Sequence, residues 1–378
     1  MNKTSITVAR LFDGEIFHHN CQVVIHDGRI AKITPVPANV EVEYKGLLVP
    51  GFIDLQVNGG GGVLFNTTPT LAGIKQMFGA HAKFGTTAML PTFITDNVEQ
   101  MALAAEAVSQ AIAENTLGIL GIHFEGPHLS VAKKGAHSAE FIREISDAEW
   151  QILSRKDLGQ IIVTLAPENV SVQDISKMVS MGIKVCLGHT NADYQTAQRA
   201  IDAGASGFTH LYNAMSPMTS REPGVVGCAL LNDHTYSGII VDGHHVEYTS
   251  CEIALKAKAP GSVFLVTDAM PPVGTDDNEF AFFDRTVHLN EGKLTSTTGE
   301  LAGSVLDMAT AVKNTYQHVN VSLDEAVRMA SLYPANYINQ SKQRGLIKAN
   351  YHADFVLLDD NLDVQSTWVA GQQLYKKQ

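Results

Sequence analysis

The sequence predicts an α/β fold in which a (β/α)8 barrel of the TIM type carries a small, discontinuous β-sandwich domain. Eight apolar runs of strand length alternate with helix-like segments through the middle of the chain, and eight parallel strands are the number that closes a barrel. Both chain ends show a different pattern, in which short runs of alternating apolar and polar residues are separated by turn dipeptides such as Asp13-Gly14 and Asp27-Gly28. An open, doubly wound sheet is the alternative that the same alternation allows.

The elements can be placed in order along the chain. Residues 1–49 and 349–378 are expected to pair into one antiparallel β domain, and residues 50–348 to form the barrel. After the last barrel strand, a hairpin is expected within residues 275–300, turning at residues 290–292 and placed to cover the site as a flap. Ser322 and Glu325 have the spacing of a capping box at a helix start. The barrel strands are expected at residues 52–57, 86–93, 118–124, 161–167, 183–188, 207–212, 238–243 and 263–268.

The composition disfavours several classes of protein and partner. A hydrophobic content of 45% and a charged content of 17% are typical of an ordered globular chain. The net charge of −12, from 27 Lys and Arg against 39 Asp and Glu, disfavours nucleic acid and anionic membranes as partners. Because no apolar run approaches the roughly 18 residues of a membrane span, we expect a cytoplasmic enzyme. The cysteines form no CxxC pair and are expected to be buried or incidental thiols: Cys21, Cys186, Cys228 and Cys251.

Four polar residues stand where predicted barrel strands end. Glu125, His189, His210 and Asp268 belong to the third, fifth, sixth and eighth apolar runs or follow them directly. Because the carboxyl ends of all strands in such a barrel face one mouth, these side chains are expected to converge despite their distance in sequence. A buried carboxylate at a strand end is costly unless a cation or a hydrogen-bond donor accompanies it.

The residue types at these strand ends indicate a metal site with a separate base. One carboxylate and two neutral imidazoles suit a divalent cation such as zinc, and three protein ligands leave a coordination position open for water. Asp268 is then free to move protons to and from that water. The structural alternatives are ordinary surface or core histidines and, for Asp268, the N-cap of a following helix.

A set of local motifs carries a resemblance to a known family. In chain order these are PGFIDLQVNGGGG, HFEGPHL, KKGAH, GHT, THLYNAMSP, REPGVVG, DGHHV and VTDAMPP. Together they make the chain similar, over most of its length, to the amidohydrolase superfamily and, within it, to the N-acetylglucosamine-6-phosphate deacetylases. The resemblance implies metal-dependent hydrolysis of a linear amide, which removes acetate from N-acetyl-D-glucosamine 6-phosphate and leaves D-glucosamine 6-phosphate for amino-sugar catabolism.

The resemblance also assigns roles to single residues. It makes Glu125, His189 and His210 the metal ligands and Asp268 the general base and then the general acid. His137, in KKGAH, matches a residue that polarises the acetamide carbonyl, which in physical terms is electrostatic stabilisation of the developing oxyanion. The structural alternative for His137 is a loop histidine without a role in the reaction.

The phosphate end of the substrate is assigned by the same resemblance. It places the phosphate on the backbone of Asn213 and Ala214, on Arg221, whose guanidinium offers forked donors, and on His245. It implies a homodimer in which His245 reaches the neighbouring subunit's site, with Arg221 a second candidate for that crossing. For Arg221 the alternative is a surface ion pair. Further matches to sugar-contacting positions are Ala136, Asp242, Leu301, Ala302 and Gly303.

One departure from the superfamily pattern limits the number of metal ions. Many amidohydrolases carry an HxH motif after the first strand for a second metal, whereas Gln56 and Asn58 stand here. Amides bind divalent cations less well than imidazoles, so we expect one metal per chain, zinc first, with iron(II), cobalt and manganese as alternatives. A phosphate cradle at residues 58–62 is the weaker interpretation of this glycine-rich run, since no GK[ST] ending follows it.

Two other functions remain open at this level. The first keeps the barrel and the metal but acts on a cyclic amide or ureide, as dihydroorotase-like relatives do. Such enzymes usually need a carboxylated lysine near the fourth strand, where IIVTLAPEN has none. The second is a barrel without activity that serves as an assembly scaffold, which would have no physical need for a buried cluster of acid and imidazole groups.

Overall fold

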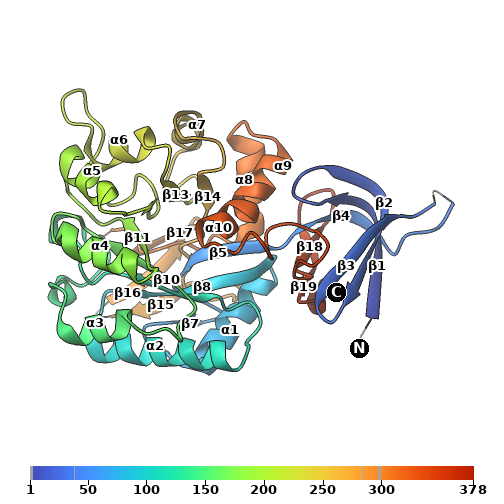
Figure 1. Cartoon of the computed structure of the whole chain (residues 1–378), viewed down its shortest axis with the longest axis horizontal. Coiled ribbons are helices and arrows are strands. Elements are labelled where there is room, and N and C mark those ends of the chain that lie inside the picture. Colours follow the sequence, from blue (N-terminus) through green and yellow to red (C-terminus); the bar gives the residue numbers. More distant parts are fainter. Residues whose placement is uncertain (1–2, 38, 284, 297–298) are drawn as a thin grey trace.

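The computed structural model describes residues 3–37, 39–283, 285–296 and 299–378. Eight parallel strands follow one another around the barrel in the order of the chain, and helices cover their outer side (Figure 1). The first barrel strand meets the segment that follows the eighth strand, which closes the barrel. Val57 there forms a parallel bridge with Ala269, and the backbone N–H of Asp268 donates to the carbonyl of Gln56 at 2.9 Å. The strands are β5 (Phe52–Val57), β8 (Thr86–Ile94), β9 (Gly121–Glu125), β10 (Gln160–Leu165), β11 (Lys184–Leu187), β12 (Gly207–Phe208), β13 (Tyr236–Ile239) and β14 (Val263–Leu265).

The (β/α)8 barrel predicted from the sequence is therefore confirmed. Strands β5 and β8 are buried along their whole length, which is why their sequences are continuous apolar runs rather than alternating ones. The helices are α1 (Leu71–Ala82), α2 (Val98–Ala113), α3 (Asp147–Leu153), α4 (Val172–Ser180), α5 (Tyr194–Asp202), α6 (Gly224–Leu231), α7 (Tyr248–Ala257), α8 (Met308–His318), α9 (Leu323–Ala330) and α10 (Leu332–Tyr337), with short 3-10 turns η1 (Val131–Lys133) and η2 (Ala139–Phe141). None of the described helices is both long and apolar enough to cross a bilayer.

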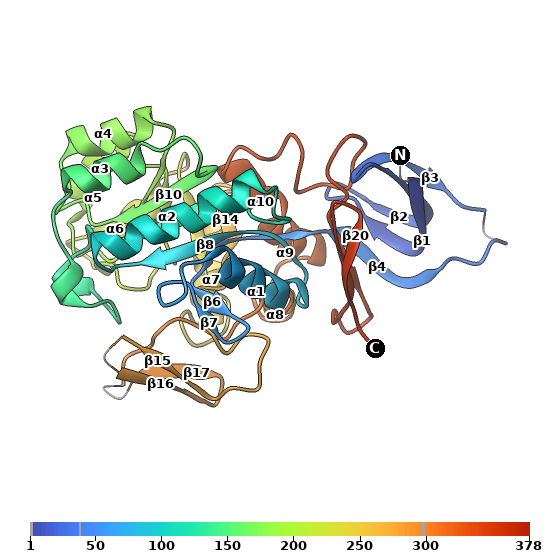
Figure 2. The same cartoon turned by 90° about the horizontal axis from the view of Figure 1, so that it is seen from below.

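A second domain, built mainly of β-sheet, is formed from both chain ends and stands beside the barrel (Figures 1 and 2), as predicted. Its strands share a hydrophobic core of their own that includes Leu48, Phe355 and Trp368. The sheet is not wholly antiparallel as expected, because its first and fourth strands pair in parallel. In spatial order the strands are β20 (Gln372–Lys376), β19 (Val364–Val369), β18 (Phe355–Leu358), β4 (Tyr44–Pro50), β1 (Lys3–Phe12), β2 (Phe17–His26) and β3 (Arg29–Pro35).

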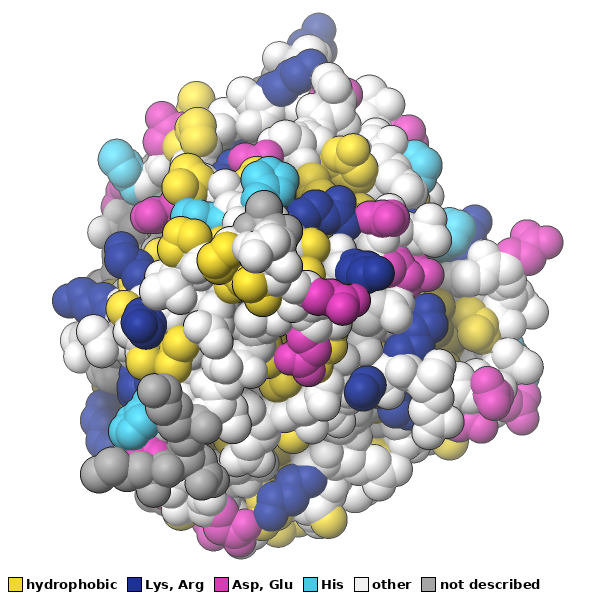
Figure 3. Space-filling view, turned by 90° about the vertical axis from the view of Figure 1, so that its right-hand side faces the viewer, with side chains coloured by type: hydrophobic (Ala, Val, Ile, Leu, Met, Phe, Trp, Pro, Cys, Tyr) yellow, Lys and Arg dark blue, Asp and Glu magenta, His cyan; other side chains and the backbone are white. Residues whose placement is uncertain are grey.

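The face of the molecule at this end carries charges of both signs. Figure 3 shows Lys and Arg side chains interspersed with Asp and Glu side chains there. Ion pairs on the β domain or between it and the barrel include Arg10 with Asp360 at 2.5 Å, Lys313 with Asp363 at 3.2 Å and Lys377 with Asp363 at 4.0 Å. The residue limits of the two domains, 49/50 and 348/349, stay a prediction.

An excursion after β14 forms a separate small sheet on one side of the barrel (Figure 2). It consists of β15 (Glu279–Phe282), β16 (Arg285–Asn290) and β17 (Lys293–Ser296), and the expected hairpin turn lies between the last two. A second hairpin, β6 (Gly59–Gly60) with β7 (Val63–Leu64), follows β5. Both contribute to one hydrophobic cluster that includes Leu64, Ile94, Met270, Phe282, Val287 and Leu294.

Two local expectations need correction. The sixth and eighth strands end at Phe208 and Leu265, earlier than predicted, because the chain then turns into positive φ at His210 and Asp268. Helix α9 begins where expected, but the side chain of Ser322 makes no capping hydrogen bond. Glu325, the other half of the expected capping box, instead accepts hydrogen bonds from Arg328 and from the hydroxyl of Tyr333.

Candidate metal centre and active site

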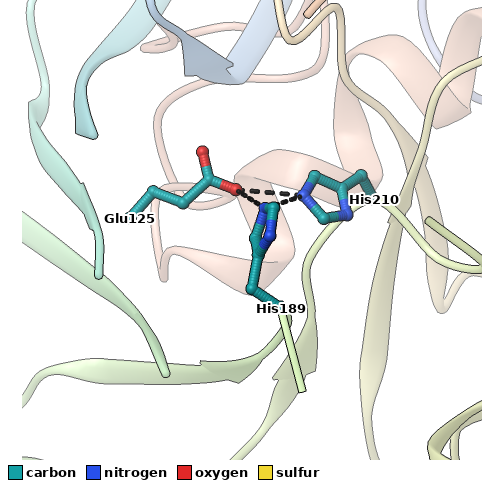
Figure 4. A group of neighbouring side chains, drawn as sticks. All are labelled: Glu125, His189 and His210. Carbon is teal, nitrogen blue, oxygen red and sulfur yellow. Dashed lines mark hydrogen bonds and ion pairs between the residues drawn. The ribbon is translucent and has the colours of Figure 1, made fainter. Parts of the chain in front are cut away.

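Three side chains converge at the mouth of the barrel (Figure 4). Glu125 is the last residue of β9, whereas His189 and His210 each lie two residues beyond β11 and β12. Oε1 of Glu125 lies 3.2 Å from Nε2 of His189 and 3.0 Å from Nε2 of His210, and the two Nε2 atoms are 3.0 Å apart. All three side chains are buried. The sequence predicted this convergence from strand ends alone.

The backbone turns sharply at the strand ends that carry these groups. His189, His210 and Asp268 have φ angles of 48°, 34° and 53°, in the left-handed region that residues other than glycine rarely adopt. Such a conformation costs about 1–3 kcal/mol per residue, and it is found most often at functional sites where the surrounding structure enforces it. The turn aims each side chain into the mouth instead of letting the strand continue.

The donor set fits a divalent cation. The Nδ1 atom of His189 lies 2.9 Å from the carbonyl of Lys133, so Nδ1 carries the hydrogen and Nε2 presents its lone pair to the other two groups. Burial raises the pKa of Glu125, but its hydrogen bonds with His189 and His210 outweigh burial and hold the pKa well below the usual value. An anionic oxygen and imidazole nitrogens, all within 4.8 Å of one another, are what zinc and its neighbours require.

Two buried amides, Gln56 and Asn58, lie beside these carboxylates. Nε2 of Gln56 donates to both oxygens of Glu125, at 3.3 and 3.2 Å, and to Oδ1 of Asp268 at 3.1 Å. Nδ2 of Asn58 donates to the same Oδ1 at 2.6 Å. Gln56 therefore links the two carboxylates through hydrogen bonds, and Asn58 adds a second donor to Asp268. These donors partly offset the repulsion between the carboxylates, as a bound cation would.

Asp268 is half-buried in this network and has an altered acidity. Burial, and next the negative charge of Glu125, raises its pKa to about 6. A carboxyl whose pKa lies this close to neutrality exchanges protons more readily than an ordinary aspartate. Both amide donors meet Oδ1, and the structure gives Oδ2 no hydrogen bond within the described residues. Oδ2 is therefore the oxygen left for proton transfer.

A second buried carboxylate stands behind Asp268. Oδ2 of Asp54 accepts a hydrogen bond from the hydroxyl of Thr267 at 2.5 Å, and burial raises the pKa of Asp54 to about 7. With the backbone bond from Asp268 to Gln56, this contact ties the first barrel strand to the end of the eighth. Asp54 thus supports the turn that carries Asp268.

His137 lies beside the three converging groups. Its ring is edge-on to that of His189, with 4.3 Å between the ring centroids, and it is buried. Its Nδ1 atom is buried without a hydrogen-bond partner among the described residues. Burial, followed by the charge of His189, lowers the pKa of His137 to about 3, so the ring is neutral. This is not the exposed loop histidine of the structural alternative.

These groups surround a cavity of about 170 Å³. Several of the predicted substrate-contacting residues line it: Ala136, His137, Asn213, Ala214, His245, Leu301 and Gly303. Asn58 lines it as well, beside Glu125, His189, His210 and Asp268. The cavity is larger than the roughly 30 Å³ share of a single water, so it has room for part of a small substrate.

Three predicted residues do not line the cavity. Ala302 is fully buried behind it, and Arg221 lies on an exposed loop. Asp242 acts on His245 instead, since its Oδ2 lies 2.6 Å from Nδ1 of His245, and its Oδ1 accepts from the backbone N–H of His245 at 2.8 Å. With Nδ1 committed to Asp242, Nε2 is the nitrogen of His245 that is left for a ligand.

The expectation that His245 crosses to a neighbouring subunit stays a prediction. His245 lines the same cavity as Asp268 of its own chain, and its charge lowers the pKa of that Asp268. Its position is set by Asp242 within a turn that directly follows β13. The exposed Arg221 is the other candidate for reaching the site of a neighbouring subunit.

The sequence interpretation missed four residues that line the cavity, Ile94, Gly135, Met270 and Phe282. A signal was available for Ile94, which ends the second barrel strand, and for Gly135 and Met270, which stand inside the motifs KKGAH and VTDAMPP. Phe282 belongs to the excursion after β14 and reaches the cavity only through folding.

Fold and site together define a barrel hydrolase with a candidate metal centre. A sequence model of the amidohydrolase family matches residues 47–374, and the chain belongs to this family. The N-acetylgalactosamine-6-phosphate deacetylase of Shewanella sp. (strain ANA-3) is 48% identical, over 97% of this chain and 94% of that protein. The N-acetylglucosamine-6-phosphate deacetylase of Haemophilus influenzae is 36% identical, over 92% and 93%. The crystal structure of N-acetylglucosamine-6-phosphate deacetylase from Pasteurella multocida is similar with a TM-score of 0.94 and 38% identity, covering 99% of this chain and all of that one.

Proposed function

We propose that this enzyme hydrolyses the acetamide of an N-acetylhexosamine 6-phosphate, with N-acetyl-D-glucosamine 6-phosphate as the reference substrate. One water is consumed, the bond between nitrogen and the acetyl carbon breaks, and acetate and D-glucosamine 6-phosphate are released. The convergence of Glu125, His189, His210 and Asp268 on one cavity supports this reaction most strongly. The similarity to deacetylases of phosphorylated amino sugars supports the substrate class.

The chain's own residues divide the chemistry among them. A divalent cation, zinc by preference, would be held by Glu125, His189 and His210 and would supply a Lewis acid that polarises the carbonyl and acidifies water. Asp268 takes the proton of the attacking water and returns it to the leaving nitrogen, because an amine anion leaves poorly. His137 presents a ring nitrogen without a protein partner on the same side as His189, where the carbonyl oxygen gains negative charge.

The phosphate is assigned to the side of the cavity that lies beyond His210. Asn213 and Ala214 follow His210 in a turn, and Nε2 of His245 faces a ligand there. Arg221 follows on an exposed loop, and we assign it to the phosphate of a substrate bound in a neighbouring subunit, which makes the working unit a homodimer. The cytoplasmic location stays a prediction from the sequence.

A second candidate substrate is N-acetyl-D-galactosamine 6-phosphate. The relative with 48% identity carries that name, whereas the Haemophilus influenzae relative with 36% identity is named for the glucosamine compound. The two sugars differ only in the orientation of the hydroxyl at C4, which is remote from the acetamide. The same metal centre and the same Asp268 serve either substrate.

Acetate release from a panel of sugars tests the proposal. The panel contains the 6-phosphates of N-acetylglucosamine, N-acetylgalactosamine and N-acetylmannosamine together with the three unphosphorylated sugars, and metal is quantified in the same preparation. We expect rapid release from at least one of the first two phosphates and far slower release from unphosphorylated sugars. If neither of these two phosphates releases acetate with the metal in place, the proposal is wrong.

A further inference from the structure

One wall of the cavity is apolar and has no part in the chemistry assigned above. Ile94, Met270 and Phe282 line it, and all three belong to the hydrophobic cluster beneath the small sheet β15–β17. Phe282 is 1% exposed, and its ring contacts those of Phe280 and Phe283 with centroids 6.0 and 4.9 Å apart. The wall is therefore packed from behind and has little freedom to yield.

The apolar wall and the residues assigned to the phosphate come from opposite sides of the barrel mouth. Ile94 ends the second strand and pairs in register with Glu125 of the third, and Met270 follows the eighth strand by way of Asp268. Asn213 follows the sixth strand, which lies opposite the second in a ring of eight. Of the candidate metal ligands, Glu125 and His189 come from the third and fifth strands between these two sides, and His210 follows the same strand as Asn213.

An acyl amide has two substituents that must go to different places. The nitrogen carries the phosphorylated sugar, whose charge requires the side assigned to the phosphate, and the carbonyl carbon carries the acyl chain, which gains from leaving water. Given the proposed function, on which this step rests, the acyl chain is directed to the opposite side. We propose that Ile94, Met270 and Phe282 form the acyl pocket, and that Phe282 sets the length of the acyl group that is accepted.

The packing explains why the pocket would favour acetyl. A longer chain would have to displace Phe282, which is held by Val287 and Leu294 of the neighbouring strands as well as by two aromatic rings. Forcing extra methylene groups against a close-packed apolar wall is energetically costly, which disfavours a longer acyl chain. The hairpin is thus a specificity element, which the sequence by itself placed only as a flap.

The ratio of kcat/KM for N-propionyl- to N-acetyl-glucosamine 6-phosphate tests this. We expect the wild type to prefer the acetyl compound at least tenfold. Phe282→Ala should shift the ratio towards the propionyl compound by roughly 10- to 200-fold, which is the discrimination that one methylene group typically gives in an apolar pocket. Phe17→Ala is the matched control, since Phe17 is an exposed phenylalanine of the β domain that neither lines the cavity nor belongs to the hydrophobic cluster behind it. Its ratio should remain that of the wild type.

A second variant protects the test against a misfolded hairpin. Ile94→Ala enlarges the same pocket from a barrel strand and should move the ratio in the same direction. An unchanged ratio in both folded variants, or an equal shift in Phe17→Ala, overturns the acyl pocket while acetate release by the wild type still stands. If the wild type cleaves neither acyl compound and no galactosamine counterpart, the proposed function fails and the pocket fails with it.

Discussion

Asn58 donates its side-chain amide to Oδ1 of Asp268 over 2.6 Å. Gln56 donates to the same oxygen and also to Glu125, so one neutral amide joins the two carboxylates and a second one orients Asp268. In a barrel with histidines at these positions, a second cation could serve that purpose. Here the arrangement needs only one cation, and Asp268 is oriented by hydrogen bonds.

This network predicts the metal content. Protein purified with zinc in excess should hold one tightly bound ion per chain, because amide nitrogens are donors that offer no lone pair to a cation. Elemental analysis after gel filtration measures the ratio. His210→Ala should fall well below one ion per chain, whereas His288→Ala, which changes a half-exposed histidine on the small sheet, should not. Two ions per wild-type chain would contradict the prediction.

Replacing Asp268 by asparagine should separate binding from turnover. The isosteric amide cannot take a proton from water, so kcat should fall by roughly 10²- to 10⁴-fold, the usual contribution of a positioned general base. The bound metal should remain, because Asp268 is not one of the three converging ligands. Steady-state kinetics and elemental analysis on the same sample check both parts. Near-native turnover would remove Asp268 from the mechanism.

Arg221 should matter only for phosphorylated substrates. Arg221→Ala should raise KM for the phosphorylated sugar by roughly tenfold or more, since hydrogen bonds to charged groups are worth about 1.5–3 kcal/mol. Slow hydrolysis of the unphosphorylated sugar should not change. Arg199→Ala on α5 is the matched control, because Arg199 is also a surface arginine and its side chain donates to Thr196 of its own helix. An unchanged KM in folded Arg221→Ala refutes the phosphate assignment.

Mixing two variants with different defects, one in KM and one in kcat, tests whether Arg221 acts across a dimer. A heterodimer of Arg221→Ala with Asp268→Asn contains one complete site if the arginine comes from the partner, and none if it serves its own chain. We therefore expect the rate at low substrate concentration, which reports kcat/KM, to recover after the two variants are unfolded and refolded together. Each variant refolded alone is the control. If the rate of the mixture does not exceed the summed rates of the two separately refolded variants, Arg221 serves the site of its own chain.

Lys258 should make stability depend on pH. Its Nζ is buried and donates to the carbonyls of Asn232 and Thr235, each at 2.7 Å, and burial lowers its pKa to about 8. Between that value and the unfolded value of about 10.4, the unfolded chain holds more protons on this group, so the free energy of unfolding rises with pH. Urea unfolding of wild type and Lys258→Met should show a difference that grows in favour of the wild type above pH 8.

An exposed lysine on the same helix gives the control for this measurement. Lys256 is exposed and pairs with Glu252 at 2.6 Å, so Lys256→Met should shift stability by an amount that hardly varies between pH 8 and 10. A difference between wild type and Lys258→Met that stays constant over the same interval would show that the buried amine titrates as it does in the unfolded chain.

The amino-acid sequence by itself determined the architecture and the chemical centre. Each barrel strand is a short apolar run, and Glu125, His189, His210 and Asp268 follow four of these runs, so the rule that parallel strands point their carboxyl ends to one mouth was enough to bring them together. The family motifs added His137, Asn213 and His245, which line the cavity.

Only the tertiary structure decided which side chains complete the cavity. Phe282 reaches it because a separate sheet packs back onto the barrel, and His245 turns to its own cavity because Asp242 holds its ring. The left-handed turns at His189, His210 and Asp268, and the amide bonds of Gln56 and Asn58, depend on contacts between segments far apart in the chain. Local secondary-structure propensity cannot predict such contacts, because they form only after the barrel has closed.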